Sequence, residues 1–167
     1  YVNRSICSYD HIASIGDNEQ EDPYHYALSL IKQIISERDQ EIASHTLSHY
    51  YCLEKGQNSE AFRDDLEAAI RLAGKEGLKL ESLVFPKNQV NKDYLPILKE
   101  KGIKAYRGNE SSWIYQGRSD EDETLLRRGL RLLDTYVNIS GHNAYDINVI
   151  KQHFPFNIPA SRFLRPY

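Results

Sequence analysis

Two histidines four residues apart stand out in the stretch EIASHTLSHYYC, which covers residues 41–52. His45 and His49 follow EIAS, a short run that predicts a buried strand. Residues four apart share one face of a helix, so both imidazoles can point at one cation. Imidazole nitrogen is a common ligand of zinc and similar metals. The same residues also allow a partly buried His45 bonded to backbone and a solvated His49.

Five more polar or aromatic side chains follow two further predicted strands, LESLVF and IKAYR. Lys87, Asn88 and Gln89 come after the first, and Asn88 and Gln89 can bond sugar hydroxyls. Arg107 and Trp113 come at and after the end of the second, and they offer guanidinium donors and an aromatic face, which suit a pyranose ring or an anionic sugar. The alternatives are a turn with a solvated lysine and a tryptophan that packs in the core or at its rim.

The elements that must position these residues alternate along the chain. Hydrophobic spacing, caps and breakers predict helices over 23–37, 59–73, 92–101 and 120–136, and strands over 41–44, 80–85, 103–107 and 137–140. In the last helix, Leu125, Leu126, Leu130 and Leu133 are expected inside. This alternation predicts an α/β fold with a parallel sheet, either doubly wound or a barrel. Sites in such folds lie at the carboxyl ends of the strands, so the polar stretches should converge on one mouth.

EIASHTLSH resembles the His-Ser/Thr-x-x-His motif of the polysaccharide deacetylases with a NodB-like domain, carbohydrate esterase family 4. The resemblance implies a distorted (β/α) barrel, of which residues 1–167 form a single partial domain. It makes His45 and His49 ligands of zinc or another divalent metal, and it gives Thr46 a role in steadying the loop. FPKNQ lies where the family has Arg-x-Pro, with Lys87 in place of the arginine.

The resemblance implies a hydrolase that removes acetyl groups from N-acetylated sugars, with a metal that activates water. The runs SHYYCLE, VFPKNQ, YRGN and SRFLRPY resemble a bacterial subgroup associated with surface-polysaccharide sugars or their precursors. The family's Thr-Phe-Asp-Asp motif does not occur in the sequence, and its nearest candidate, Asp10 in CSYDH, precedes the histidines by too few residues. His142 is the internal candidate for the family's late histidine. Catalytic residues are therefore left unassigned, and the resemblance places the rest of the barrel outside residues 1–167.

Two other functions remain open from the same residues. One is a non-catalytic carbohydrate-binding or scaffold domain that retains the barrel. The other is a structural zinc site, which would need a closing ligand such as Cys52 or His25.

Composition narrows the classes of partner and compartment. The 167 residues are 27% charged with a formal net charge of −3, so they carry no basic field for nucleic acid. No apolar run reaches the roughly 20 residues of a membrane span, and the first residues do not read as a signal peptide. Cys7 and Cys52 lie too far apart for a CxxC motif and are too few for a disulfide framework. We therefore expect a cytoplasmic protein; its oligomeric state is left open.

Overall fold

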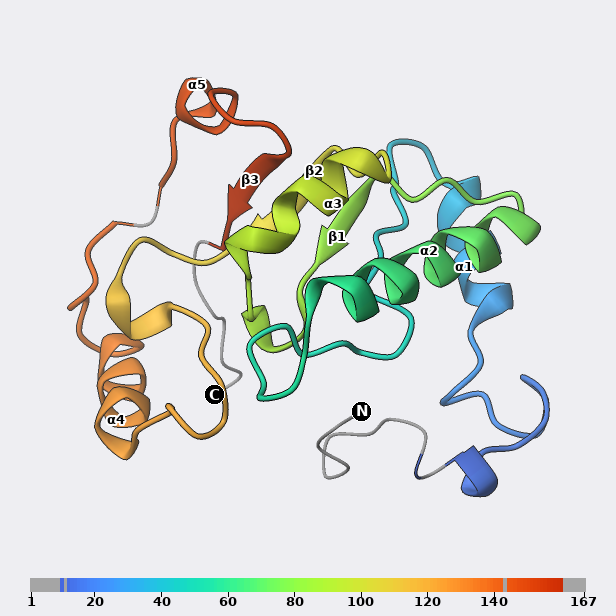
Figure 1. Ribbon diagram of the computed structural model, residues 1–167, viewed down its shortest axis with the longest axis horizontal. Helices are drawn as coiled ribbons and strands as arrows, with labels where there is room; N and C mark the ends of the chain where they lie inside the picture. Colours follow the sequence, from blue (N-terminus) through green and yellow to red (C-terminus); the bar gives the residue numbers. More distant parts are fainter. Residues whose placement is uncertain (1–9, 11, 143, 161–167) are drawn as a thin grey trace.

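The centre of the molecule is a small parallel sheet, seen in a computed structural model that describes residues 10, 12–142 and 144–160. Its three strands are β1 (Ser82–Val84), β2 (Ala105–Gly108) and β3 (Phe156–Pro159), in the order β1-β2-β3 (Figure 1). Both pairs are parallel, with Val84 opposite Arg107 and Arg107 opposite Ile158. The chain is therefore a mixed α/β protein.

Ser44 extends this sheet on the far side of β1. It forms an isolated parallel bridge with Leu83. Ser44 N donates to the Ser82 carbonyl at 2.9 Å, and Val84 N donates to the Ser44 carbonyl at 2.8 Å. The predicted strand over 41–44 is thus reduced to one bridge, which still brings the next residue, His45, to the carboxyl end of β1.

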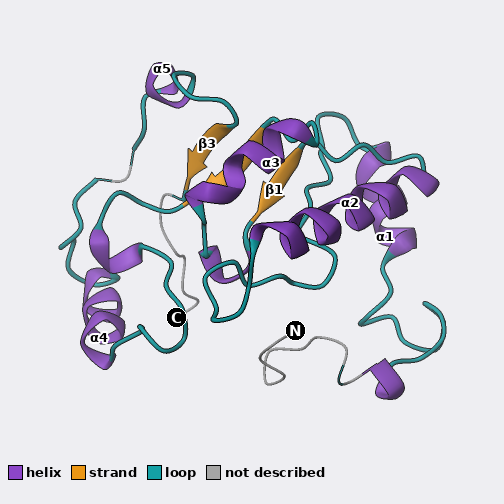
Figure 2. Cartoon of the chain, in the orientation of Figure 1, coloured by secondary structure: helices purple, strands orange, loops and turns teal. Residues whose placement is uncertain are grey.

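The longest helices alternate with the strands, as the sequence predicts (Figure 2). The four longer α-helices are α1 (Leu28–Ser36), α2 (Ser59–Lys75), α3 (Leu95–Glu100) and α4 (Leu125–Asp134), and the short α5 covers Ile147–Ile150. Four short 3₁₀ helices are also described: η2 (Ile12–Ser14), η3 (Pro86–Asn88), η4 (Lys92–Tyr94) and η5 (Trp113–Tyr115). Of these, η4 runs into α3, and α4 packs against η5. No helix in the described part has the length and hydropathy needed to cross a bilayer.

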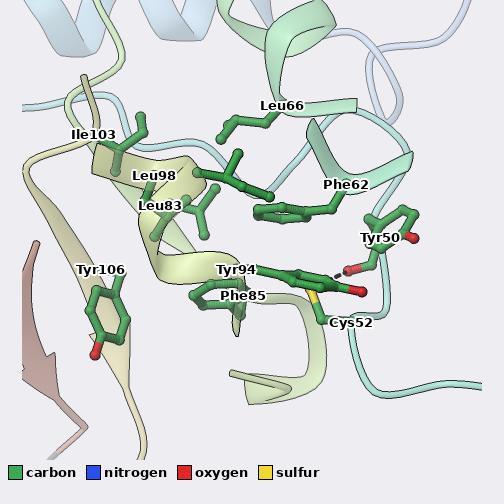
Figure 3. Packing of buried hydrophobic residues seen from close by; sticks show 11 residues of the cluster. Tyr50, Cys52, Phe62, Leu66, Leu83, Phe85, Tyr94, Leu98, Ile103 and Tyr106 are labelled. Atoms are coloured by element: carbon green, nitrogen blue, oxygen red, sulfur yellow. Dashed lines mark hydrogen bonds between the residues drawn. The ribbon is translucent and has the colours of Figure 1, made fainter. Parts of the chain in front are cut away.

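The hydrophobic core lies on one face of the sheet, between the strands and helices α2 and α3 (Figure 3). Phe62 of α2 stacks on Tyr94 at 4.9 Å and on Phe85 at 5.9 Å between ring centroids. Stacked aromatic rings add to the free energy gained from burying their apolar area. The fully buried aliphatic members of this cluster are Leu66, Leu83, Leu98 and Ile103.

The other face of the sheet is open. Successive strand residues point to opposite faces, so Val84, Arg107 and Ile158 lie on the face away from Leu83 and Tyr106. A hollow of about 360 Å³ runs along this face, and Ile158 on it is 51% exposed. The described residues thus form an open sheet, and they show no closed barrel.

Three expectations from the sequence are corrected. The helix predicted over 23–37 begins only at Leu28. The described residues form no strand at 137–140, and the third strand is instead β3, in a segment without strand periodicity. In α4, Leu125 is 82% exposed, and Leu126 and Leu133 are also exposed, whereas Arg127 and Asp134 are buried.

Hydrogen bonds explain this reversal in α4. The buried Arg127 guanidinium donates from Nη2 to the carbonyl oxygens of Trp113 (2.7 Å) and Gln116 (2.9 Å). Asp134 accepts from the Tyr115 hydroxyl at 2.7 Å. The polar side chains of α4 therefore hold η5, and three of the four leucines of the predicted inner face, Leu125, Leu126 and Leu133, are left toward solvent.

Candidate functional site

The segment that carries His45 and His49 is a loop, which corrects the helical turn predicted from their spacing. Thr46 and His49 have left-handed backbone conformations, with φ of 64° and 54°. Tyr50 N donates to the Thr46 side-chain oxygen at 2.7 Å, so a side chain takes the place of a helical carbonyl as acceptor. The two histidines are brought together by loop geometry rather than by helical periodicity.

Asp65 of α2 fixes this loop from outside. Its carboxylate accepts from Leu47 N at 2.7 Å, from Ser48 N at 2.9 Å and from the Ser48 hydroxyl. Hydrogen bonds to an ionised acceptor are among the stronger ones in proteins. Asp65 was not singled out from the sequence, although its spacing from Phe62, Leu66 and Ala69 puts a carboxylate on the inner face of the helix.

The two imidazoles lie against each other at the carboxyl end of β1. Their ring centroids are 4.7 Å apart, with 63° between the ring planes. His45 Nδ1 lies 2.8 Å from the Val84 carbonyl oxygen, which only accepts, so Nδ1 donates this hydrogen bond and Nε2 is the ring nitrogen left for another partner. Burial, together with the positive charges of His45 and Lys87, lowers the pKa of His49. The lowered pKa favours the neutral form of His49, which is the form that binds a metal.

No third metal ligand is found among the described residues: they contain no group of three His, Cys, Asp or Glu side chains that could hold a metal ion. Cys52 lies in the hydrophobic core, where burial, and then Asp65, raise the pKa of its thiol far above the usual value. Its Sγ lies 3.7 Å from the Tyr50 carbonyl. The other suggested closing ligand, His25, has its Nδ1 2.8 Å from Asp22 Oδ2. Cys7 lies outside the described residues.

A polar cavity of about 340 Å³ lies at the carboxyl ends of β1 and β2. Three of the predicted sugar-binding residues, Lys87, Asn88 and Arg107, line it. Trp113 does not; its side chain is 55% exposed, and its ring centroid lies 5.9 Å from Arg127 Cζ. The cavity therefore joins residues that follow two different strands, while the tryptophan lies against α4.

Lys87 connects the cavity to the histidine loop. Its ammonium lies 2.6 Å from Asp120 and 4.5 Å from the ring centroid of Tyr51, whose own ring contacts His49 at 4.9 Å. Partial burial opposes the charge on Lys87, but the hydrogen bond and the charge of Asp120, together with smaller contributions from neighbouring groups, outweigh it and raise the pKa of Lys87. The lysine thus stays protonated at the boundary between the histidines and the cavity.

A buried amide ties the loops around the cavity together. Gln89 is fully buried, and its Nε2 donates to Glu54 at 2.7 Å and to the Arg118 carbonyl at 2.9 Å. Its Oε1 accepts from Leu53 N at 3.0 Å, and Glu54 also accepts from Asp120 N at 3.0 Å. Sequence reasoning missed this network, because a glutamine and a glutamate 35 residues apart give no local signal.

The remaining candidates lie at the surface or outside the described part. Asp10 and His142 are exposed. Residues 161–167, which contain SRFLRPY, lie outside the described residues.

The chain matches no model of a known protein family, and no curated protein or solved structure is significantly similar to it. The resemblance to the polysaccharide deacetylases therefore stays a prediction from the two-histidine motif and its surroundings.

Proposed function

We propose that this chain carries part of the active site of a metal-dependent hydrolase that removes acetyl groups from N-acetylated sugars of a bacterial surface polysaccharide or its precursor. The observation that carries the proposal is the histidine pair: His45 and His49 have ring centroids 4.7 Å apart at the carboxyl end of a parallel sheet. Two imidazoles on one tetrahedral zinc would have centroids about 5 Å apart, since each nitrogen lies about 2.0–2.1 Å from the metal.

The hydrogen bond from His45 to the Val84 carbonyl supports a ligand role. Metal-binding histidines usually donate their second ring N–H to a carbonyl or carboxylate, which fixes the tautomer and the ring orientation. In this arrangement, His45 would use Nε2 as its ligand atom. A catalytic zinc usually has three protein ligands, and the described residues would supply two of them, His45 and His49.

A divalent metal bound here would polarise the carbonyl of the acetyl group and would lower the pKa of a bound water to near 7. The residues of the chain would bind and orient the sugar. Asn88 offers an amide and Arg107 a guanidinium to hydroxyl groups in the adjoining cavity, and Lys87 lies between the cavity and the histidines. The open face of the sheet, with its hollow of about 360 Å³, fits a proposal that the sheet is one arc of a distorted barrel.

A non-catalytic carbohydrate-binding or scaffold domain is the second candidate. The described residues favour it in one respect, since they provide a polar cavity but no third metal ligand. Metal content and hydrolysis distinguish the two candidates.

The test compares His45→Ala and His49→Ala with His153→Ala, which removes an exposed histidine outside the site. Each protein is loaded with zinc and dialysed, and zinc is measured by elemental analysis. We expect the parent and His153→Ala to retain about one zinc per chain, and the two loop variants to lose it, because a single imidazole holds the metal far more weakly.

Acetate release from N-acetylglucosamine oligomers is measured on the same proteins. Release that disappears in both loop variants supports the hydrolase. Equal zinc content in all four proteins would reject the metal site. Zinc binding without any acetate release would leave the binding domain as the better description.

A further inference from the structure

The cavity beside the histidine loop has more cationic side chains than its carboxylates neutralise. Lys87 is paired with Asp120 at 2.6 Å, and Arg131 with Glu123 at 3.1 Å. Two further cations, Arg107 and Arg118, also line the cavity.

Arg107 and Arg118 form no ion pair within 4.0 Å with any carboxylate that the structure describes. The remaining carboxylate of the cavity wall, Glu110, is only 4% exposed. The lining of this cavity of about 340 Å³ thus has four cationic side chains for three carboxylates, although the chain as a whole is negative, and the guanidinium groups of Arg107 and Arg118 are not in an ion pair with a described carboxylate.

Both arginines extend from backbone that is held in place. Arg107 belongs to β2, the central strand of the sheet. The Arg118 carbonyl accepts the hydrogen bond from the buried Gln89. Next to it, Gly117 lies so close to the 86–89 turn that an added Cβ would be 2.1 Å from the Asn88 carbonyl oxygen. The backbone that carries Arg107 is thus fixed by the sheet, and the backbone that carries Arg118 is fixed by its contacts with the 86–89 turn.

A guanidinium presents paired N–H donors that match the two oxygens of a carboxylate or phosphate. A neutral sugar does not require two guanidinium groups that lie outside ion pairs. We propose that this cavity binds an anionic group, a carboxylate or a phosphate, on the sugar, so that the substrate is an acidic N-acetylated sugar. The cavity is at the small end of ligand sites, which suits one sugar residue. The identification of the substrate rests on the proposed hydrolase function. Binding of the anionic group can be measured whether or not the protein is a hydrolase.

The test measures binding of three probes by titration calorimetry at low salt: N-acetylglucosamine, N-acetylmuramic acid and N-acetylglucosamine 6-phosphate. We expect at least one acidic sugar to bind about tenfold or more tightly than the neutral one, since hydrogen bonds to charged groups are stronger than those to neutral groups. The two acidic probes distinguish a carboxylate from a phosphate as the preferred group.

Arg107→Gln and Arg118→Gln should each reduce this affinity about tenfold or more, and they should weaken the binding of the neutral sugar much less. Arg107→Lys and Arg118→Lys keep the charge but not the paired donors, so these variants should retain only part of the affinity for the acidic sugar. Arg128→Gln, which removes an exposed arginine of α4 outside the cavity, is the matched control.

Two results would overturn the inference: acidic sugars that bind no more tightly than the neutral one, or an equal loss of affinity in Arg128→Gln. His45→Ala separates it from the proposed function. Acidic-sugar binding that persists in His45→Ala while zinc is lost supports both proposals. Unchanged zinc content in His45→Ala, together with arginine-dependent binding, would reject the metal site and retain the anion site.

Discussion

Asp65 shapes a loop to which it is not adjacent in sequence. Its carboxylate accepts the N–H groups of Leu47 and Ser48, which lie between the two histidines. These bonds hold the segment in a conformation with two left-handed residues, Thr46 and His49. Such conformations cost energy for residues other than glycine and persist only where the surroundings fix them. The position of His49 relative to His45 therefore depends on a residue of α2.

Replacing Asp65 should disturb the arrangement of His45 and His49 although neither histidine is substituted. We expect Asp65→Ala to lower zinc affinity about 10- to 100-fold, the usual effect of removing a group that orients metal ligands. It should also lower the free energy of unfolding by about 1–3 kcal/mol, because two backbone N–H groups lose their acceptor. Zinc titration and urea unfolding measure the two effects.

The neighbouring Asp64 provides the control, since it is exposed on the same helix. Asp64→Ala should leave both quantities within a few tenths of a kcal/mol of the parent. Asp65→Asn should recover part of the affinity, because its amide oxygen can still accept. An equal loss in Asp64→Ala would mean that the charge of α2, and not the hydrogen bonds, supports the loop.

Among the elements, β2 and β3 approach each other closely at a glycine. Gly108 is buried and lies opposite Pro159, and an added Cβ would be 1.8 Å from Asn157 Oδ1. In contrast, a Cβ added to Gly129 of α4 would meet nothing within 4 Å. The same substitution should therefore have opposite effects at these two sites.

Gly108→Ala should destabilise the protein by about 1–3 kcal/mol, the usual cost of overpacking. Gly129→Ala should stabilise it by about 0.5–1 kcal/mol, because alanine loses less backbone entropy in a helix. Urea unfolding of the two variants measures the difference. Similar values for both would contradict the close packing of β3 against β2.

The sequence predicts those elements whose burial follows their own periodicity. Helix α2 and strands β1 and β2 belong to this group, since their apolar residues face the core at regular spacing. Strand β3 could not be predicted, because its place depends on pairing with β2 some 50 residues earlier. The prediction of the inner face of α4 was wrong, because Arg127 and Asp134 are buried there and form hydrogen bonds that a hydrophobic pattern does not indicate.

The candidate site divides in the same way. Lys87, Asn88 and Arg107 line one cavity because the ends of parallel strands meet at one edge of the sheet, which the alternation of elements predicts. Asp65, Gln89 and Arg118 reach the site through contacts between distant segments. Their roles depend on the folded arrangement, so composition and spacing do not reveal them.

At the scale of the whole molecule, Asp134 connects three segments around α4. It is fully buried and accepts from the Tyr115 hydroxyl, from Ser140 N at 2.5 Å and from the Ser140 hydroxyl at 2.7 Å. Burial opposes its charge, but these hydrogen bonds outweigh burial and lower the pKa of Asp134 to about 2. Folding therefore favours the ionised form.

This lowered pKa predicts a loss of stability in acid. The folded pKa is below the ordinary value of 3.8, so the stabilisation is fully present above about pH 4 and is lost as the pH falls toward 2. Asp134→Asn should be less stable than the parent at pH 7, and the gap should narrow as the pH falls through this range. Urea unfolding at several pH values measures it. A gap that does not change with pH would contradict the prediction, and Asp64→Asn serves as the exposed control.

The contact between Gly117 and the Asn88 carbonyl also bears on how ligand preference could change. Where two stretches of main chain touch directly, the outline of the cavity is set by peptide groups that every amino acid shares. Substitutions there can disrupt the wall but cannot redesign it. A change in ligand preference would therefore come from substitutions of side chains that line the cavity, such as Arg107 and Arg118.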